Sequence, residues 1–251
     1  MTAVEKSFYV DDLLLSVDSV EEAGTLLNDI KTICNRGRFN LTEITANNRE
    51  VLNSLSTSEL AKDIREMDFA NEDLPVERAL GVAWRVELDV FGFKIREPDG
   101  SPNSRRGLLS SVYAIYDPFG FIGPAILPAK RILQELCRRK CNWDTEIPDD
   151  LKTIWIRWGG ELNLLSSYEV PRWNGESGEG DRGELHVFCD GSEIGYGAAA
   201  YVRVKNAGGI RCTLTLAKSR LAPLKKISIP RLELAGAKLA VELASIIKRE
   251  R

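Results

Sequence analysis

The chain has 251 residues, of which 43% are hydrophobic and 28% charged, and its formal net charge is −3. This length supports a sizeable core in one large domain or two smaller ones. No apolar run approaches the ~20 residues of a membrane span, the first eight residues are too short and polar for a signal peptide, and five scattered cysteines do not suggest a disulfide framework. We therefore expect a reduced intracellular protein, with no preference between cytoplasm and nucleus.

The charge is unevenly distributed along the chain. Residues 1–183 carry 22 basic and 31 acidic residues, whereas residues 184–251 carry 12 and 6. A basic C-terminal part can follow a phosphate backbone, although a solvated helix face has the same composition.

The first predicted element is a β-hairpin. Apolar runs at residues 8–10 and 13–15 flank Asp11 and Asp12, which are expected at the turn. Adjacent carboxylates repel each other, so they need a cation or full hydration. Both interpretations stay open on this pattern: a divalent metal held by oxygen ligands or a hydrated turn.

A helix is predicted next. Ser19 and Glu22 have the spacing of a capping box, apolar residues then recur at helical intervals, and Gly37 ends the pattern. Residues 39–42 are expected to form a returning strand, and residues 53–77 a helix plus loop.

The sequence pattern in the middle of the chain predicts first strands and then helices. Every second residue from 82 to 88 is apolar, and a strand there would place Val82, Trp84, Val86 and Leu88 on one face. Residues 90–95 are expected to complete a hairpin. Helical patterns follow at residues 107–116, 129–139 and 149–165, separated by Pro-containing segments.

The C-terminal part of the chain follows a predicted flexible linker at residues 174–184. This linker is rich in glycine and has no apolar residue. Beyond it, the pattern predicts three strands and a helix: residues 185–189, 197–204 and 210–216, and a helix from about Arg231.

Two carboxylates stand out in this C-terminal part. Asp190 ends the first of its strands before a Gly-Ser turn, and Glu233 lies near the start of the helix, after Pro230. A helix laid across the sheet would bring both to one metal ion. The alternative is an acid at a strand-end turn and another favourably placed near a helix N-terminus.

Several long motifs resemble the polyprotein of BEL/Pao-type retrotransposons, in the region named for the Pao retrotransposon peptidase family. They are, in chain order, SFYVDDLLLSVDS, RALGVAW, RGLLSSVYAIYDPFGFIGPAILPAK, NWD and AKSRLAPLKKISIPRLELAGAKLA. The resemblance covers nearly the whole chain, from the catalytic hairpin of a reverse-transcriptase palm into a ribonuclease H domain.

For the hairpin, the resemblance implies that Asp11 binds the catalytic Mg²⁺ pair of a DNA polymerase and that Asp12 supports it. Two-metal nucleotidyl transfer would be the reaction. Such a site also needs a carboxylate from an earlier palm strand, and none of the ten residues before Asp11 is an Asp in a strand. We therefore expect no DNA synthesis by this chain alone.

For the C-terminal part, the resemblance implies Mg²⁺-dependent hydrolysis of the RNA strand of an RNA–DNA hybrid. Asp190 would bridge the metal ions and Glu233 would bind one of them. Tyr9, Ser192 and Arg231 are implied contacts to nucleic acid. Two further acids of the family pattern are not found, so we expect this site to be incomplete too.

These inferences lead to one expected organisation. We expect an α/β (α+β) fold, with a truncated palm and connection followed by a partial ribonuclease H-like β-β-β-α unit. The boundaries are 1–100 for the palm part, 101–173 for a helical connection, 174–184 for the linker and 185–251 for the ribonuclease H-like part.

The expected function is that of a reverse transcriptase/ribonuclease H fragment, inactive alone, with RNA, DNA or their hybrid as partner and no membrane. Its status as an enzyme is left open. The alternative is a non-catalytic nucleic-acid-binding or scaffold protein coopted by the host. The chain has no Asp-Thr/Ser-Gly motif and a single histidine, His186, so peptidase activity is not expected.

Overall fold

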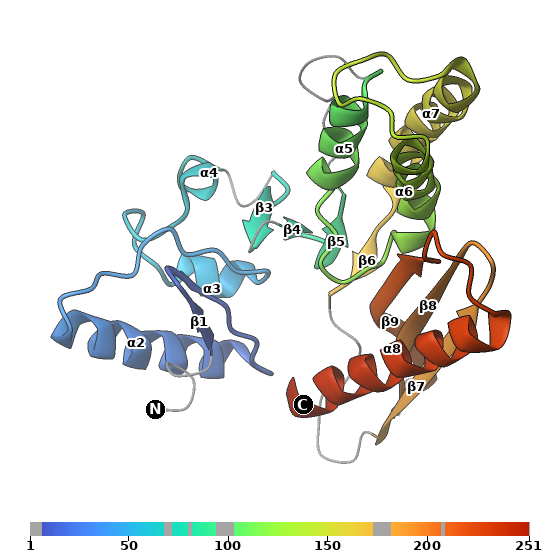
Figure 1. Ribbon diagram of the computed structural model, residues 1–251. Helices are drawn as coiled ribbons and strands as arrows, with labels where there is room; N and C mark the ends of the chain where they lie inside the picture. The colour runs from blue at the N-terminus through green and yellow to red at the C-terminus, as the bar shows by residue number, and fades with distance from the viewer. Residues whose placement is uncertain are drawn as a thin grey trace. The chain divides into compact units, whose positions relative to one another are not determined.

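The computed structural model describes residues 7–67, 72–79, 82–93, 103–172, 182–206 and 209–250. The chain divides into two compact units, Met1–Phe91 and Gly92–Arg251. Both contain helices and strands (Figure 1), which confirms the predicted mixed α/β class. Among the described residues, no helix combines the length and apolar character that a membrane crossing requires.

The first unit contains short strands and helices around a small core. Its elements are β1 (Phe8–Tyr9), β2 (Asp12–Leu13), α2 (Val20–Arg36), α3 (Arg49–Asn53), α4 (Lys62–Arg65), β3 (Val76–Ala79) and β4 (Val82–Arg85). Strand β5 (Val90–Gly92) lies at the division between the units. The core gathers Leu52, Leu60, Ile64, Leu74 and Val86, with Trp84 packed against them.

The predicted first hairpin and the helix after it are confirmed. Strands β1 and β2 pair antiparallel. The Ser19 hydroxyl accepts the N–H of Glu22 at 3.1 Å and caps α2. The carboxylate of Glu22 reaches back one residue further than a capping box requires and accepts the N–H of Asp18 at 3.3 Å.

The predicted strand at residues 39–42 is wrong. Arg38 has a φ of 60°, and the N–H of Phe39 donates to the carbonyl of Cys34 at 2.9 Å, so the chain curls around the end of α2. The predicted place of Leu88 on a strand face is also wrong. This residue is 62% exposed because β4 ends at Arg85 and residues 86–89 form a turn.

In its described part, the second unit combines a group of helices with an antiparallel sheet that a further helix covers on one face (Figure 1). Its elements are α5 (Arg105–Ala114), α6 (Gly123–Arg138), α7 (Asp149–Leu162), a 3-10 helix η1 (Asn163–Ser167), β6 (Val170–Pro171), β7 (Arg182–Gly191), β8 (Gly195–Asn206), β9 (Gly209–Leu221) and α8 (Ile229–Glu250).

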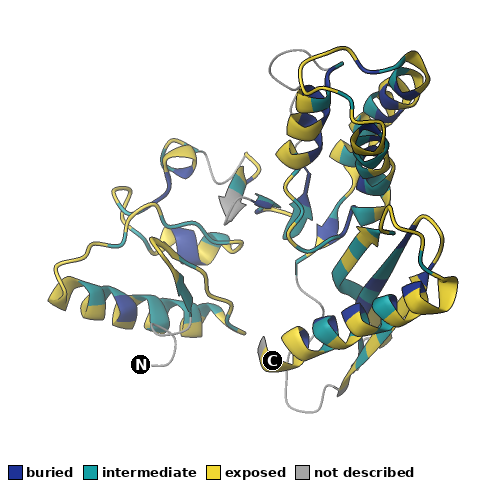
Figure 2. Ribbon diagram, viewed as in Figure 1, coloured by how far each residue is buried: buried dark blue, intermediate teal, exposed yellow. Residues whose placement is uncertain are grey.

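Strands β7, β8 and β9 form an antiparallel meander, and α8 packs on one face of it. Helix α8 is amphipathic, with buried and exposed residues recurring along its length (Figure 2). Its buried residues Leu239, Leu243 and Ile247 pack against Ala198 and Ala200 of β8.

Helix α6 begins six residues earlier than the sequence indicates. Pro124 occupies the first turn, where a missing N–H costs nothing. Pro128 lies inside the helix instead of preceding it. The half-buried carboxylate of Asp117 accepts the N–H groups of Phe121 and Ile122, both at 3.0 Å, and satisfies donors just before this helix.

The segment before α6 also contacts the sheet. The N–H of Ala217 in β9 donates to the carbonyl of Phe119 at 2.7 Å. Gln134 of α6 donates from Nε2 to the carbonyl of Ala222 at 2.7 Å. Residues far apart in sequence are thereby joined within the second unit.

All three strands of this sheet extend further than predicted at both ends. Most of the predicted linker, residues 174–181, lies outside the described residues, and residues 182–184 belong to β7. Helix α8 starts at Ile229, close to the predicted position.

Candidate functional site

The end of β7 and the second turn of α8 bring Asp190 and Glu233 together. Asp190 is paired with Gly197 of β8, one residue before the strand ends. Glu233 lies near the start of α8, whose main chain runs directly beside that strand end. The meeting of strand and helix is the arrangement expected from the sequence.

Two glycines permit this close approach. A Cβ atom on Gly191 would lie 2.5 Å from the nitrogen of Glu233 and 2.8 Å from the carbonyl oxygen of Leu232. A Cβ atom on Gly236 would lie 2.9 Å from the carbonyl oxygen of Asp190. Side chains at either position would separate the two main chains, so glycine is required at both.

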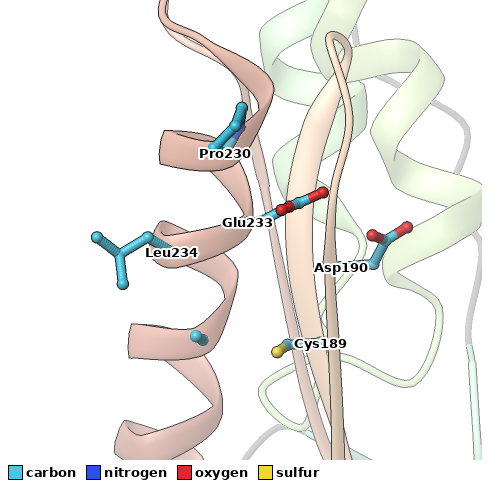
Figure 3. A pocket seen from close by; sticks show the side chains of 6 residues that line it. Cys189, Asp190, Pro230, Glu233 and Leu234 are labelled. Carbon is cyan, nitrogen blue, oxygen red and sulfur yellow. The ribbon is translucent and has the colours of Figure 1, made fainter.

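A pocket of about 480 Å³ opens at this junction. Its lining residues are Cys189, Asp190, Pro230, Glu233, Leu234 and Ala237. Figure 3 shows the Glu233 side chain extending from α8 toward the strand end that carries Asp190, whereas Leu234 points away from the strands.

The two carboxylates carry no compensating cation from the described part of the chain. Both residues are exposed, and no ion pair or hydrogen bond engages either side chain there. Carboxylate oxygens are the ligands that Mg²⁺ prefers. The donor type therefore fits this ion, although no cluster of three or more metal-ligating side chains occurs among the residues described.

Ser192 and Arg231 lie on either side of this pair. Ser192 closes the turn between β7 and β8: its N–H donates to the carbonyl of Gly195 at 2.8 Å, and its hydroxyl donates to the same oxygen at 3.1 Å. The side chain of Arg231 is exposed two residues before Glu233. The structure thus gathers four of the candidate site residues at one end of the sheet.

Asp11 and Asp12 lie in the other unit, at the tip of the first hairpin. Tyr9 pairs with Asp12, so Val10 and Asp11 form the two-residue turn. The prediction that Asp12 lies in the turn is wrong by one residue, because Asp12 begins β2. Tyr9 is 65% exposed, and both acids are exposed. All three side chains are accessible to a ligand in solution.

The turn that presents Asp11 is strained. Val10 has a φ of 55°, a conformation that β-branched residues strongly disfavour. Two-residue hairpin turns with a positive φ at this place normally have glycine. Such strain is often found at functional sites.

Two basic residues of the sequence RRK at 138–140 already pair with carboxylates. Arg138 and Arg139 both bind the carboxylate of Glu135, and Arg139 also binds Asp150 at 2.7 Å. The two guanidinium groups lower the pKa of Glu135 to about 2. These arginines are therefore poorly available for phosphate.

Sequence reasoning missed Cys189 and Gly236, and it assigned Gly191 only to a tight turn, whereas Gly191 is the last residue of β7. The two glycines are the residues that set the separation of β7 and α8. A glycine inside a helix and another at a strand end are a usable signal of close main-chain contact, but the sequence does not say which segments meet.

Comparisons with known proteins assign a family to the part of the chain that contains this pocket. Residues 104–251, more than half of the chain, match the family described as the Pao retrotransposon-like RNaseH-like domain. No match was found among curated proteins or among solved structures. The matched segment contains α5–α8, the β7–β9 sheet and both pocket carboxylates. The chain therefore belongs to the Pao retrotransposon-like RNaseH-like domain family.

Proposed function

We propose that this chain is part of a retrotransposon reverse transcriptase/ribonuclease H polyprotein and that its second unit binds a divalent cation beside an RNA–DNA hybrid. The observation that carries the proposal is the approach of α8 to β7, which places Asp190 and Glu233 in one pocket. The family match supports a retrotransposon origin and an RNase H-like fold.

Asp190 and Glu233 would hold the cation. Two neighbouring carboxylates without a cationic partner repel each other, and a divalent ion relieves that repulsion. When bound, Mg²⁺ supplies charge neutralisation at a phosphate and lowers the pKa of a coordinated water. The turn at Ser192 fixes the end of β7, and Arg231 offers a cation to a backbone phosphate.

Hydrolysis by two metal ions needs ligands for both ions. Only two carboxylates line the described pocket, and a thiol is a poor ligand for Mg²⁺. We therefore propose that the chain alone binds the hybrid and a cation without cutting the RNA strand, and that full activity requires carboxylates from elsewhere.

For the first unit we propose the corresponding polymerase role. Asp11, supported by Asp12, would bind Mg²⁺ in a palm hairpin, and Tyr9 would contact nucleic acid. The exposed, strained turn between two paired strands supports this assignment.

A second candidate is a protein that the host has coopted, which binds nucleic acid and catalyses no reaction. The basic composition of residues 184–251 favours it. Both candidates predict binding of a hybrid, and they differ in whether cation binding at Asp190 and Glu233 has been kept.

The test incubates the full chain with an RNA–DNA hybrid labelled on its RNA strand, with and without Mg²⁺. We expect binding that rises with Mg²⁺ and an intact RNA strand. Asp190→Asn should remove the Mg²⁺ effect while the binding seen in EDTA persists. RNA cleavage that is lost in Asp190→Asn would overturn the non-catalytic part, and an unchanged Mg²⁺ effect in this variant would overturn the site.

A further inference from the structure

A strongly basic segment connects the sheet to α8. The fourteen residues from 218 to 231, KSRLAPLKKISIPR, contain five basic residues and no acidic one. They form the end of β9, the connection and the first turn of α8. We refer to Lys218, Arg220, Lys225, Lys226 and Arg231 as the basic segment.

Main-chain contacts fix where this segment lies. Leu221 of β9 pairs with Gly195, and the N–H of Ala222 donates to the carbonyl of Ile194 at 2.9 Å. Gly195 also accepts hydrogen bonds from Ser192, which follows β7 directly. The basic segment therefore starts at the same end of the sheet as Asp190.

Its other end reaches the second carboxylate. The segment finishes at Arg231, two residues before Glu233, where α8 contacts Gly191. The basic segment thus begins and ends beside the Asp190–Glu233 pocket.

The strand register shows where Lys218 and Arg220 lie relative to the strand that lines the pocket. Cys189 pairs with Ala198, and Ala198 pairs with Lys218, so these residues form one row across the sheet. Arg220 lies in the next equivalent row, opposite Tyr196, which pairs with Gly191. Two strand spacings amount to roughly 10 Å, which is the separation between the main chains of β7 and β9.

All five side chains are available. Each of the five residues is exposed, and within the described part of the chain none pairs with a carboxylate. Arg138 and Arg139 differ in this respect, because Glu135 and Asp150 hold them.

We propose that the basic segment binds the phosphate backbone of nucleic acid and holds one strand across the Asp190–Glu233 pocket. Flexible lysine and arginine side chains bind phosphates without reading bases, and each contact releases a condensed counterion. The segment therefore supplies orientation and register, while the carboxylate pair supplies the cation site. This inference rests on the function proposed above.

The test compares two charge-matched double variants in the full chain. Lys225→Gln/Lys226→Gln removes two charges from the basic segment. Lys205→Gln/Lys248→Gln removes two exposed lysines at distant places: Lys248 lies fifteen residues beyond Glu233 along α8, roughly 22 Å, and Lys205 lies at the opposite end of β8 from Gly195.

Binding of a fluorescein-labelled RNA–DNA hybrid is measured in EDTA by anisotropy between 50 and 200 mM KCl. The plot of log affinity against log salt should lose about two units of slope in Lys225→Gln/Lys226→Gln. Its affinity at 50 mM KCl should fall roughly tenfold or more. The control pair should stay close to the unmodified chain in both quantities.

Equal salt slopes for all three proteins would overturn the proposal, and so would binding of phosphatidylserine vesicles in place of the hybrid. Because EDTA removes any cation, the result does not depend on the Asp190–Glu233 pair. If Lys225→Gln/Lys226→Gln reduces the salt slope but Mg²⁺ does not strengthen binding by the unmodified chain, the basic segment is supported and the cation site is refuted. If the salt slope is unchanged but Mg²⁺ strengthens binding, the cation site is supported and the basic segment is refuted.

Discussion

Replacing Gly191 by alanine is expected to force α8 away from the end of β7. The added Cβ would lie 2.5 Å from both the nitrogen of Glu233 and the carbonyl carbon of Leu232. These are main-chain atoms and cannot rotate away, so the helix must retreat by about 1 Å to restore ordinary contacts of roughly 3.5 Å.

The loss of stability follows from the overpacking of this close contact. We expect Gly191→Ala to lower the free energy of unfolding by roughly 1–3 kcal/mol and to weaken Mn²⁺ binding at Asp190 and Glu233 roughly tenfold or more. Urea unfolding and a Mn²⁺ titration measure the two effects.

Gly160→Ala is the matched control. Gly160 lies exposed in α7, and a Cβ atom added there would have nothing within 4 Å, so the same substitution should stabilise the helix by roughly 0.5–1 kcal/mol. If Gly191→Ala were as stable as Gly160→Ala and bound Mn²⁺ normally, the close approach of α8 to β7 would be refuted.

Three further predictions concern other parts of the fold. Gly120→Ala should lower the free energy of unfolding by roughly 2–3 kcal/mol, because its Cβ would lie 2.0 Å from the carbonyl oxygen of Ala217 and its φ is 75°; an unchanged urea midpoint would contradict this contact. Val10→Gly should stabilise the first hairpin by about 1 kcal/mol and slow hydrogen exchange of its amides about fivefold; faster exchange would argue against the strained turn. The pKa of Glu59 is lowered from 4.5 to about 2, chiefly by its hydrogen bond from Lys31, so its stabilising contribution is complete above pH 4.5 and is lost as the pH falls toward 2. The stability difference between the unmodified chain and Glu59→Gln should shrink over that interval, and a constant difference would refute the ion pair.

Local patterns predicted the elements whose signals are themselves local. The cap at Ser19 and the end of α2 at Gly37 depend on neighbouring residues only, and the structure places both there. The strand expected at residues 39–42 failed because the positive φ of Arg38, which no residue type at that position announces, turns the chain back.

The predicted start of α6 failed for a different reason. Proline is expected to break a helix, whereas α6 tolerates Pro128 as its sixth residue. Asp117 accepts the N–H groups of Phe121 and Ile122 just before the helix starts, and the segment is held against β9. Tertiary contacts outweighed the local preference.

At the candidate site, Asp190 and Glu233 could be named from the sequence because their motifs are long. Their shared pocket depends on Gly191 and Gly236, whose contacts join segments about forty residues apart. Likewise, Lys218 and Arg220 lie beyond the strand predicted at residues 210–216, whereas the structure includes both in β9. Only the register of β7, β8 and β9 places them in rows with the pocket strand.

The most direct test of the shared cation site is a Mn²⁺ titration followed by electron paramagnetic resonance. It uses the full chain carrying Asp11→Asn and Asp12→Asn, so that the hairpin cannot contribute. We predict one bound ion, weakened roughly tenfold or more by either Asp190→Asn or Glu233→Gln. Glu193→Gln, a neighbouring exposed acid outside the pocket lining, should leave binding within about twofold. Binding that is equally affected by all three substitutions, or by none, would contradict the proposed site.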